Sequence, residues 1–180
     1  MIERIKIKVL ESIEQLYTYD LVLIKNNLCE RTITHKLAEY LQKRFAEYNV
    51  DCEYNRDVTQ GKNHKKTITL NDAFAHRRDS ENYNQNSELL YQEYSTYPDI
   101  IIHRRESNDS NILIIEAKKS NSIIGYGHDS VKLSAFTDLD GGYKFKYGLF
   151  IEFNIEDINE KPKLVWFSNG QIVDINIYPQ

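Results

Sequence analysis

Apolar side chains recur at intervals of three and four residues along the first part of the chain, and this spacing predicts amphipathic helices. The first stripe runs through residues 1–27 and predicts an N-terminal helical segment there. Within this segment Ile5, Ile7 and Val9 also alternate with lysines. That alternation is typical of a strand, so residues 4–10 have two interpretations, and we prefer the helix because the longer stripe includes them.

A second stripe of apolar residues predicts a helix from Cys29 to Tyr48. The alternating residues 50–54 then predict a short strand. Residues 55–97 carry little apolar periodicity and many polar side chains. We interpret them as a long polar insertion that is helical only near residues 89–94. Loops of this length in compact domains are usually functional or disordered.

The pattern changes after Pro98. Residues 100–102 and 112–115 are short unbroken aliphatic runs, rich in isoleucine, and the turn-forming residues 106–110 separate them. Such runs between turn signals are typical of buried strands. They predict a β-hairpin at the centre of a sheet.

The rest of the chain alternates between helix and strand patterns. A helix is predicted over residues 129–137, and strands are predicted over residues 147–153, 163–167 and 171–177. Helices that precede and interrupt a sheet predict an α/β fold, in which helices flank a central mixed β-sheet in three layers. We expect the whole chain, residues 1–180, to form a single domain.

Composition narrows the class of protein. Roughly 28% of the residues are Ile, Leu, Val or Phe, which is above the ~20% below which chains stay disordered. No apolar run approaches the ~18 residues of a membrane span, and the charged N-terminus is unlike a signal peptide. We therefore expect a soluble, cytoplasmic protein with no membrane partner.

Charge and cysteine content add two expectations. The net charge of −4 argues against attraction of the whole surface to nucleic acid, so any such contact must come from local basic clusters. Cys29 and Cys52 are the two cysteines. In a chain without export signals we expect both to be reduced and buried as small apolar side chains.

The central hairpin brings charged residues together. If its turn is centred between Ser107 and Asn108, Asp99 lies directly opposite Glu116 on the neighbouring strand. Directly opposed residues point to the same side of a sheet, with Cβ atoms about 4.5–5.5 Å apart. Lys118 projects to that side too, because side chains alternate along a strand. The hairpin is therefore predicted to carry two carboxylates and a lysine on one face.

Two carboxylates this close repel each other and lose hydration beside aliphatic strands unless a cation neutralises them. Mg²⁺ prefers oxygen ligands and typically takes one or two carboxylates, so Asp99, Glu116 and the backbone carbonyl of Ala117 are candidate ligands. Lys118 would orient or deprotonate an attacking water, or stabilise negative charge on a phosphate. Structural alternatives stay open: Asp99 could simply begin a strand after Pro98, and Glu116 could form an ion pair with Lys118 or an arginine.

Helix periodicity places three further charged residues. Glu30 shares the inward face of its predicted helix with Ile33, from where it would reach the carboxylate pair. A carboxylate favoured by the helix dipole is an equal alternative for Glu30. Asp129 and Lys132 belong to the later predicted helix. We interpret them as ordinary solvated charges, and a place at the edge of the site is the alternative.

The segment Tyr97-Pro98-Asp99-Ile100-Ile101-Ile102, followed by Ile114-Ile115-Glu116-Ala117-Lys118, resembles the PD-(D/E)xK nuclease superfamily, which includes many restriction endonucleases and Holliday-junction resolvases. The resemblance covers residues 29–153 and implies a restriction-endonuclease-like fold with Mg²⁺- or Mn²⁺-dependent phosphodiester hydrolysis. It implies Asp99 and Glu116 as metal ligands and Lys118 as the catalytic lysine. Glu30 occupies the place of a further acidic residue that the preceding helix supplies in many members, which makes it a further catalytic and metal-ligand candidate.

We therefore expect an endonuclease that acts on DNA in preference to RNA, in restriction, defence or repair. A C2 homodimer or a larger defence or repair assembly would suit a protein that cuts both strands. Two alternatives stay open. One is a nucleic-acid-binding module that keeps the nuclease fold without turnover. The other is a protein-interaction component, which the acidic net charge and the tyrosines of the 55–97 insertion motivate.

Overall fold

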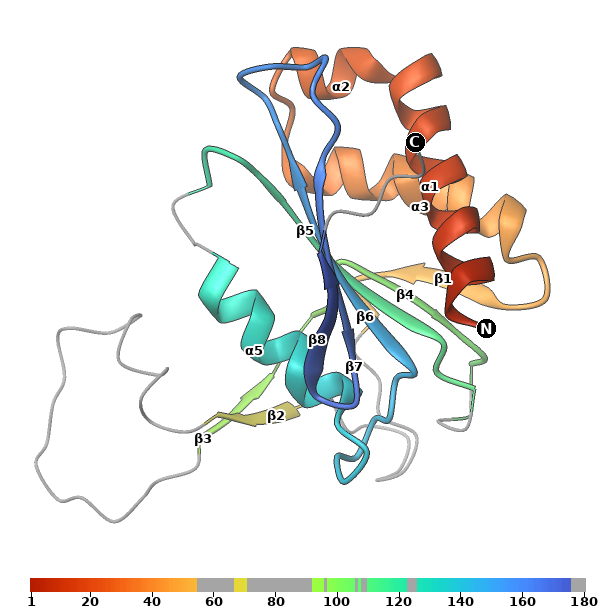
Figure 1. Ribbon diagram of the computed structural model, residues 1–180, viewed down its shortest axis with the longest axis vertical. Helices are drawn as coiled ribbons and strands as arrows, with labels where there is room; N and C mark the ends of the chain where they lie inside the picture. Colours follow the sequence, from red (N-terminus) through yellow and green to blue (C-terminus); the bar gives the residue numbers. More distant parts are fainter. Residues whose placement is uncertain are drawn as a thin grey trace, which may run out of the picture.

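A computed structural model of the chain shows helices on both sides of a central sheet (Figure 1). The structure describes residues 1–54, 67–70, 92–95, 97–105, 107, 110–122 and 126–175. Within these residues no helix is long and apolar enough to cross a membrane.

The first part of the chain is helical, as the spacing of its apolar residues predicts. Its helices are α1 (Ile2–Tyr19), α2 (Leu21–Lys25) and α3 (Glu30–Arg44). Residues 4–10 are helix, and the apolar stripe of α1 is buried. The predicted N-terminal segment is divided at Asp20, whose backbone leaves the helical region and whose carboxylate accepts a hydrogen bond from the Tyr40 hydroxyl.

Helix α3 stops short of its predicted end at Tyr48 because Phe45 turns out of the helical conformation and buries its ring in the core. Strand β1 (Asn49–Cys52) follows. The two cysteines at the edges of these elements are free thiols, but both are exposed, so their predicted burial is wrong. Cys29 caps the start of α3, and Cys52 ends an edge strand.

The predicted helix near residues 89–94 is also wrong where the structure describes it. Strand β3 (Gln92–Ser95) pairs there with β2 (Thr67–Leu70) in a separate two-stranded sheet. The antiparallel ladder between them gives their backbone groups partners that local sequence did not reveal. Most of the remaining 55–97 insertion, including Tyr83 and Tyr91, lies outside the described residues.

The central sheet has six strands in the order β1-β4-β5-β6-β7-β8. After β1 come β4 (Ile100–His103), β5 (Leu113–Lys119), β6 (Tyr147–Phe153), β7 (Lys163–Ser168) and β8 (Gln171–Ile175). Strands β5 and β6 are parallel, whereas the other neighbours are antiparallel. Parallel neighbours need a crossover connection, which contains α5 (Tyr126–Thr137). The predicted α/β fold with a mixed sheet is confirmed.

The boundaries of the later elements differ slightly from those predicted. Helix α5 begins at Tyr126 rather than at residue 129, and β5 continues beyond the aliphatic run 112–115 to Lys119, so that Glu116 and Lys118 lie on the strand. The predicted last strand extends to residue 177, of which the structure describes β8 up to Ile175. The extension of β5 is the difference that bears on the candidate site.

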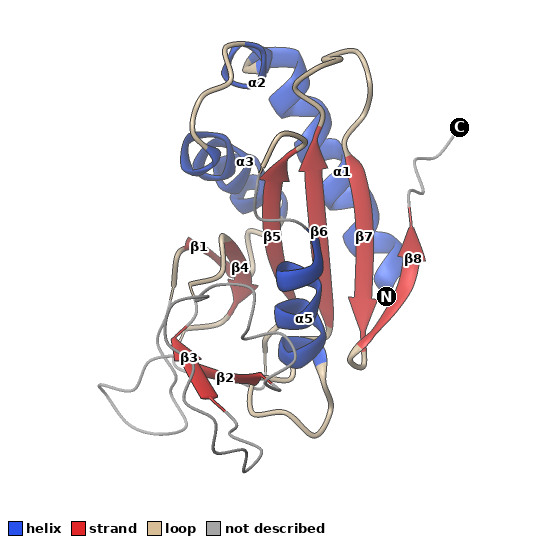
Figure 2. Ribbon diagram, turned by 90° about the vertical axis from the view of Figure 1, so that its left-hand side faces the viewer, coloured by secondary structure: helices blue, strands red, loops and turns tan. Residues whose placement is uncertain are grey.

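Each face of the sheet has its own apolar core, and Figure 2 shows α5 in front of the strands with α1 and α3 behind them. On β5, Leu113, Ile115 and Ala117 pack on the side of α1 and α3. Ile114 packs on the side of α5, with Leu133 of that helix. Alternation along the strand therefore assigns odd-numbered residues of β5 to one core and even-numbered residues to the other.

Candidate active site

The hairpin of β4 and β5 has the predicted register. Its paired residues are Ile100 with Ile115, Ile101 with Ile114 and Ile102 with Leu113. Continued by one position, this register sets Asp99 opposite Glu116. Glu116 and Lys118 are two and four residues beyond Ile114 and share its side of the sheet. Asp99, two residues before Ile101, is on the same side, which α5 covers.

Strand β5 continues past the start of β4, and two carboxylates bind the N–H groups along this edge. The Ala117 N–H donates to Asp99 Oδ2 at 2.8 Å, and the Lys119 N–H donates to Glu30 Oε1 at 3.1 Å. These N–H groups are two residues apart, so they point to the same edge. The Ala117 carbonyl points there too, because the N–H and C=O of one strand residue face the same neighbour.

Lys118 contacts carboxylates from helices on opposite faces of the sheet. Its Nζ lies 3.6 Å from Glu30 Oε2 of α3 and 3.7 Å from Asp129 Oδ2 of α5. The Lys118 side chain is 16% exposed. The structure therefore brings Glu30 to Lys118 and to the backbone of Lys119, next to the carboxylate pair that it was predicted to reach.

Two members of this cluster have the less favoured of their two interpretations. Asp129 and Lys132, interpreted as solvated, are buried on α5. Lys132 Nζ lies 2.7 Å from Glu116 Oε1 and 3.4 Å from Asp129 Oδ1. The ion pair of Glu116 is thus with Lys132 rather than with Lys118 or an arginine. A signal was present, because Asp129 and Lys132 share one helical face with the buried Leu133 and Phe136.

Two carboxylate oxygens of the cluster, Glu116 Oε1 and Asp129 Oδ2, are buried and accept no hydrogen bond of good geometry. Glu116 is 1% exposed and Asp129 is 2% exposed. Each oxygen is instead paired with an ammonium group: Glu116 Oε1 lies 2.7 Å from Lys132 Nζ, and Asp129 Oδ2 lies 3.7 Å from Lys118 Nζ. Buried polar atoms usually have hydrogen-bond partners, so both oxygens keep the capacity to bind a further donor or cation.

Burial dominates the electrostatics of the paired strand carboxylates. It raises the pKa of Glu116 to about 8, against the opposing positive charge of Lys132 and with the support of the nearby Asp99 carboxylate. Burial also raises the pKa of Asp99, despite the hydrogen bond from the Ala117 N–H. A nearby cation would favour the ionised form of both groups.

The pKa values of Asp129 and Lys118 depend more on neighbouring charges than on burial. Burial alone would raise the pKa of Asp129, but His128 and the lysines Lys132 and Lys118 outweigh it and lower the pKa. Burial would likewise lower the pKa of Lys118, but the surrounding carboxylates, Asp129 foremost, raise it. Lys118 and Asp129 are therefore both charged at neutral pH.

The cluster has the charge and the donor atoms that suit a divalent cation. Its carboxylates exceed its lysines by two, the members being Asp99, Glu116, Asp129 and Glu30 against Lys118 and Lys132. Within the described part of the chain no three His, Cys, Asp or Glu side chains form a ligand set by themselves. Mg²⁺ commonly binds through one or two carboxylates and keeps several waters. Asp99, Glu116 and the Ala117 carbonyl are therefore sufficient donors.

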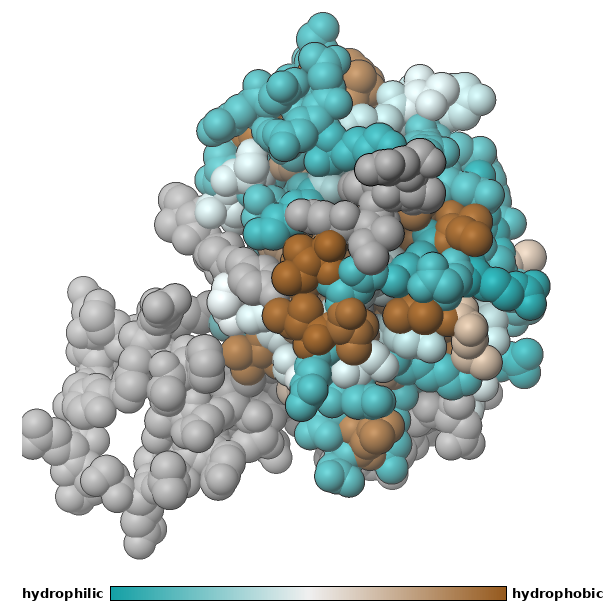
Figure 3. Space-filling model, viewed as in Figure 1, coloured by the Kyte–Doolittle hydropathy of each residue, from teal (hydrophilic) through white to brown (hydrophobic). Residues whose placement is uncertain are grey.

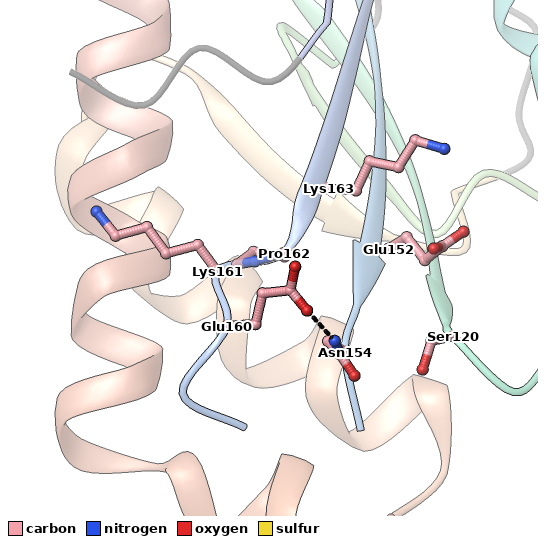
Figure 4. Close-up of a pocket in the computed structure, with 7 residues that line it drawn as sticks. All are labelled: Ser120, Glu152, Asn154, Glu160, Lys161, Pro162 and Lys163. Atoms are coloured by element: carbon pink, nitrogen blue, oxygen red, sulfur yellow. Dashed lines mark hydrogen bonds between the residues drawn. The ribbon is translucent and has the colours of Figure 1, made fainter. Parts of the chain in front are cut away.

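A pocket of about 410 Å³, lined mostly by polar residues, opens at the carboxyl end of β6, which is the end of the sheet that carries the candidate site (Figure 4). Strand pairing sets Glu152 beside Lys118 and Lys163 beside Glu152, so the three form a row across the sheet. In Figure 4 Glu160 turns toward Asn154, while Glu152 and Lys163 point to the opposite side from Lys161. The pocket lining mixes both signs of charge and does not by itself select an anionic or a cationic ligand.

Comparison with known proteins adds no assignment. No protein-family model matches the chain, and no curated protein sequence matches it. The candidate site therefore rests on the hairpin register, the open edge of β5 and the buried charges of α5.

Proposed function

We propose that this protein is a metal-dependent nuclease that hydrolyses phosphodiester bonds, with DNA favoured over RNA as its substrate. One observation carries the proposal: Asp99 and Glu116 lie opposite each other at the end of a buried hairpin, with Lys118 on the same face. The resemblance of these strands to the PD-(D/E)xK pattern, and the α/β fold with a mixed sheet, support it. A restriction-endonuclease-like fold is part of the same proposal.

In this mechanism Asp99, Glu116 and the Ala117 carbonyl would hold Mg²⁺ or Mn²⁺. The bound ion would polarise a phosphate oxygen and acidify a water molecule. Lys118 would orient the attacking water or stabilise the negative charge that develops on the phosphate. Glu30 is a positioning residue in this scheme, because it contacts both the Lys118 ammonium and the backbone of Lys119.

The test of this function is a cleavage panel. The purified protein is incubated with linear, circular, single-stranded and branched DNA and with RNA, each with Mg²⁺, Mn²⁺ or a chelator. We expect cleavage of at least one DNA substrate with Mg²⁺ or Mn²⁺ and none with the chelator. Cleavage that persists in the chelator, or no cleavage of any substrate, would contradict the proposal. A cytoplasmic homodimer, or a defence or repair assembly, is the setting we propose for this activity.

The second candidate function is a protein-interaction module that keeps this fold without turnover. A separate observation favours it: the edge strand β8 exposes Ile172, Val173 and Ile175 at about half of their surface. Figure 3 shows apolar atoms gathered over this part of the molecule. Edge strands of natural proteins usually carry charge or proline as protection against pairing. A wild-type protein that cleaves nothing in the panel would favour this candidate.

A further inference from the structure

Helix α5 contributes a second buried lysine to the candidate site. The side chain of Lys132 is 11% exposed and that of Lys118 is 16% exposed, so their ammonium groups are shielded to a similar degree. Both lysines contact the same carboxylate, since Asp129 Oδ1 lies 3.4 Å from Lys132 Nζ and Asp129 Oδ2 lies 3.7 Å from Lys118 Nζ. Asp129 is the link between the lysine on the strand and the lysine on the helix.

Stability alone does not account for these charges. Lys132 lies on the helical face that also carries Leu133 and Phe136, which pack against the sheet. A buried ion pair contributes little net stability, because desolvation of its charges offsets their attraction, and well-packed apolar residues often replace it without loss.

Lys132 lies next to the proposed metal site. Its Nζ contacts Glu116 Oε1, an oxygen of the carboxylate assigned to the metal. A cation at Glu116 would compete with Lys132 for this oxygen. The long flexible stem of lysine lets the ammonium turn to a neighbouring anion. Asp129 Oδ1 would keep the Lys132 ammonium within the site, where the substrate phosphate is the anion that it would contact.

We propose that Lys132 is a second catalytic lysine, which contacts a phosphate oxygen of the nucleic-acid substrate, and that Asp129 is the positioning residue of both lysines. This inference rests on the proposed nuclease function. It assigns the substrate-binding charge of the site to α5 as well as to the hairpin, so that one ammonium group from the sheet and one from the helix face the same phosphate.

The experiment compares Lys132→Met with a control, Lys146→Met, whose exposed lysine precedes the other end of β6. Affinity for a fluorescein-labelled DNA duplex is measured by anisotropy in Ca²⁺ at several salt concentrations. Loss of one phosphate contact should weaken binding about three- to tenfold and lower the slope of log affinity against log salt by about one. Lys146→Met should leave both quantities unchanged. A purely structural ion pair would not move the salt slope.

Two further measurements test the positions of the groups. Mn²⁺ affinity, measured by calorimetry, should not be weakened in Lys132→Met, because Lys132 competes for Glu116. In Asp129→Asn both lysines remain, so the salt slope should be kept while kcat/KM falls about tenfold or more. The double variant Asp129→Asn/Lys132→Met should lose less than the product of the two single losses, because both substitutions disturb one contact.

The results separate this inference from the nuclease proposal. If the wild type cleaves DNA and Lys132→Met matches Lys146→Met in affinity, salt slope and kcat/KM, Lys132 is structural and the inference is overturned. If the wild type cleaves nothing but the salt slope still depends on Lys132, the nuclease proposal fails and the phosphate contact stands. If the wild type binds no duplex, the inference about Lys132 fails, and the cleavage panel alone decides the nuclease proposal. Should Lys132→Met lose its cooperative unfolding transition, Lys132→Gln supplies the same measurements.

Discussion

At the scale of single residues, the neighbouring charges decide how each buried carboxylate behaves. Glu116 and Asp129 are almost equally buried, yet the pKa of Glu116 is raised to about 8 whereas the pKa of Asp129 is lowered. The difference arises because Asp129 lies close to Lys118, Lys132 and His128, whereas Glu116 has one close lysine beside two carboxylates. Similar burial therefore gives opposite electrostatic results.

Substitutions at Lys118 and Glu116 should separate chemistry from metal binding. Lys118→Ala keeps both strand carboxylates, so Mn²⁺ affinity should largely survive, while cleavage should fall by about 10² or more. Glu116→Gln should weaken Mn²⁺ binding and cleavage together, because a neutral amide neutralises a divalent ion poorly. Titration calorimetry and steady-state kinetics measure the two effects. Full cleavage by Lys118→Ala would contradict its assigned role.

The two thiols should differ in reactivity. The hydrogen bond with the Thr32 side chain lowers the pKa of Cys29. Desolvation of its sulfur, with the Asp99 carboxylate nearby, raises the pKa of Cys52 to about 11. At pH 8 the thiolate population of Cys52 should therefore be at least about 100-fold smaller than that of Cys29. The thiolate of Cys52 is intrinsically more nucleophilic because its pKa is higher. This difference reduces the rate advantage of Cys29 to about tenfold.

Single-cysteine variants measure the difference directly. Cys29→Ser leaves only Cys52, and Cys52→Ser leaves only Cys29. Reaction of each with a disulfide reagent at pH 8 should be about tenfold or more faster for the variant that retains Cys29. Equal rates in the two variants would show that the surroundings of the thiols do not differ as described.

At the scale of elements, the site depends on how closely α5 approaches the sheet. Gly148 of β6 lies under this helix, and a Cβ atom built on it would lie 3.2 Å from Thr137 Cγ2 and 3.3 Å from Leu133 Cδ2. The absence of a side chain at Gly148 thus permits the close packing of helix on strand. The same packing sets the depth at which Asp129 and Lys132 reach Glu116.

Gly148→Ala should therefore displace α5. We expect a loss of about 1–3 kcal/mol in the free energy of unfolding from overpacking, together with reduced cleavage, because the helix carries two charged groups of the site. Gly142→Ala is the matched control, since a Cβ there meets nothing within 4 Å. Urea denaturation of both variants checks the prediction, and equal stability of the two would refute it.

At the scale of the whole molecule, the site lies where both layers of helices meet the end of the sheet. Glu30 comes from the α3 side, Asp129 comes from the α5 side, and both contact Lys118. Away from the candidate site, the Asp51 carboxylate links the edge strand β1 to β4. Asp51 of β1 lies 2.9 Å from His103 of β4 and accepts hydrogen bonds from Arg105.

Asp51 should contribute to the stability of the fold in a pH-dependent way. Burial alone would raise its pKa, but the hydrogen bonds from Arg105 and His103 outweigh burial and lower the pKa below the ordinary 3.8. The ionised form is thus favoured in the folded state. Its contribution to stability is present above pH 3.8 and is lost as the pH falls through the lowered pKa.

Asp51→Asn should consequently destabilise the protein at pH 7 by about 1–3 kcal/mol, because it removes the charge from these hydrogen bonds. The difference from the wild type should shrink as the pH falls below about 4. Urea denaturation at pH 7, 5 and 3.5 measures this trend, with the exposed Asp140→Asn as control. A constant difference at all three pH values would contradict the assignment.

Some features of this protein followed from the sequence by itself. The position of the turn between the unbroken aliphatic runs 100–102 and 112–115 predicted the register that sets Asp99 opposite Glu116. Local sequence suffices there, because the length and position of the turn fix the register of a hairpin. Local periodicity placed Glu30 on the inward face of its helix and predicted the α/β fold.

Tertiary structure decided which other charges joined this pair. The helical stripe that contains Leu133 also contains Asp129 and Lys132, but a stripe does not state which part of a sheet it will cover. Packing at Gly148 and the extension of β5 past β4 settled that position. Long-range pairing likewise made a strand of Gln92–Ser95. Contacts between segments distant in sequence supply these energies, and such contacts leave no local periodicity to read.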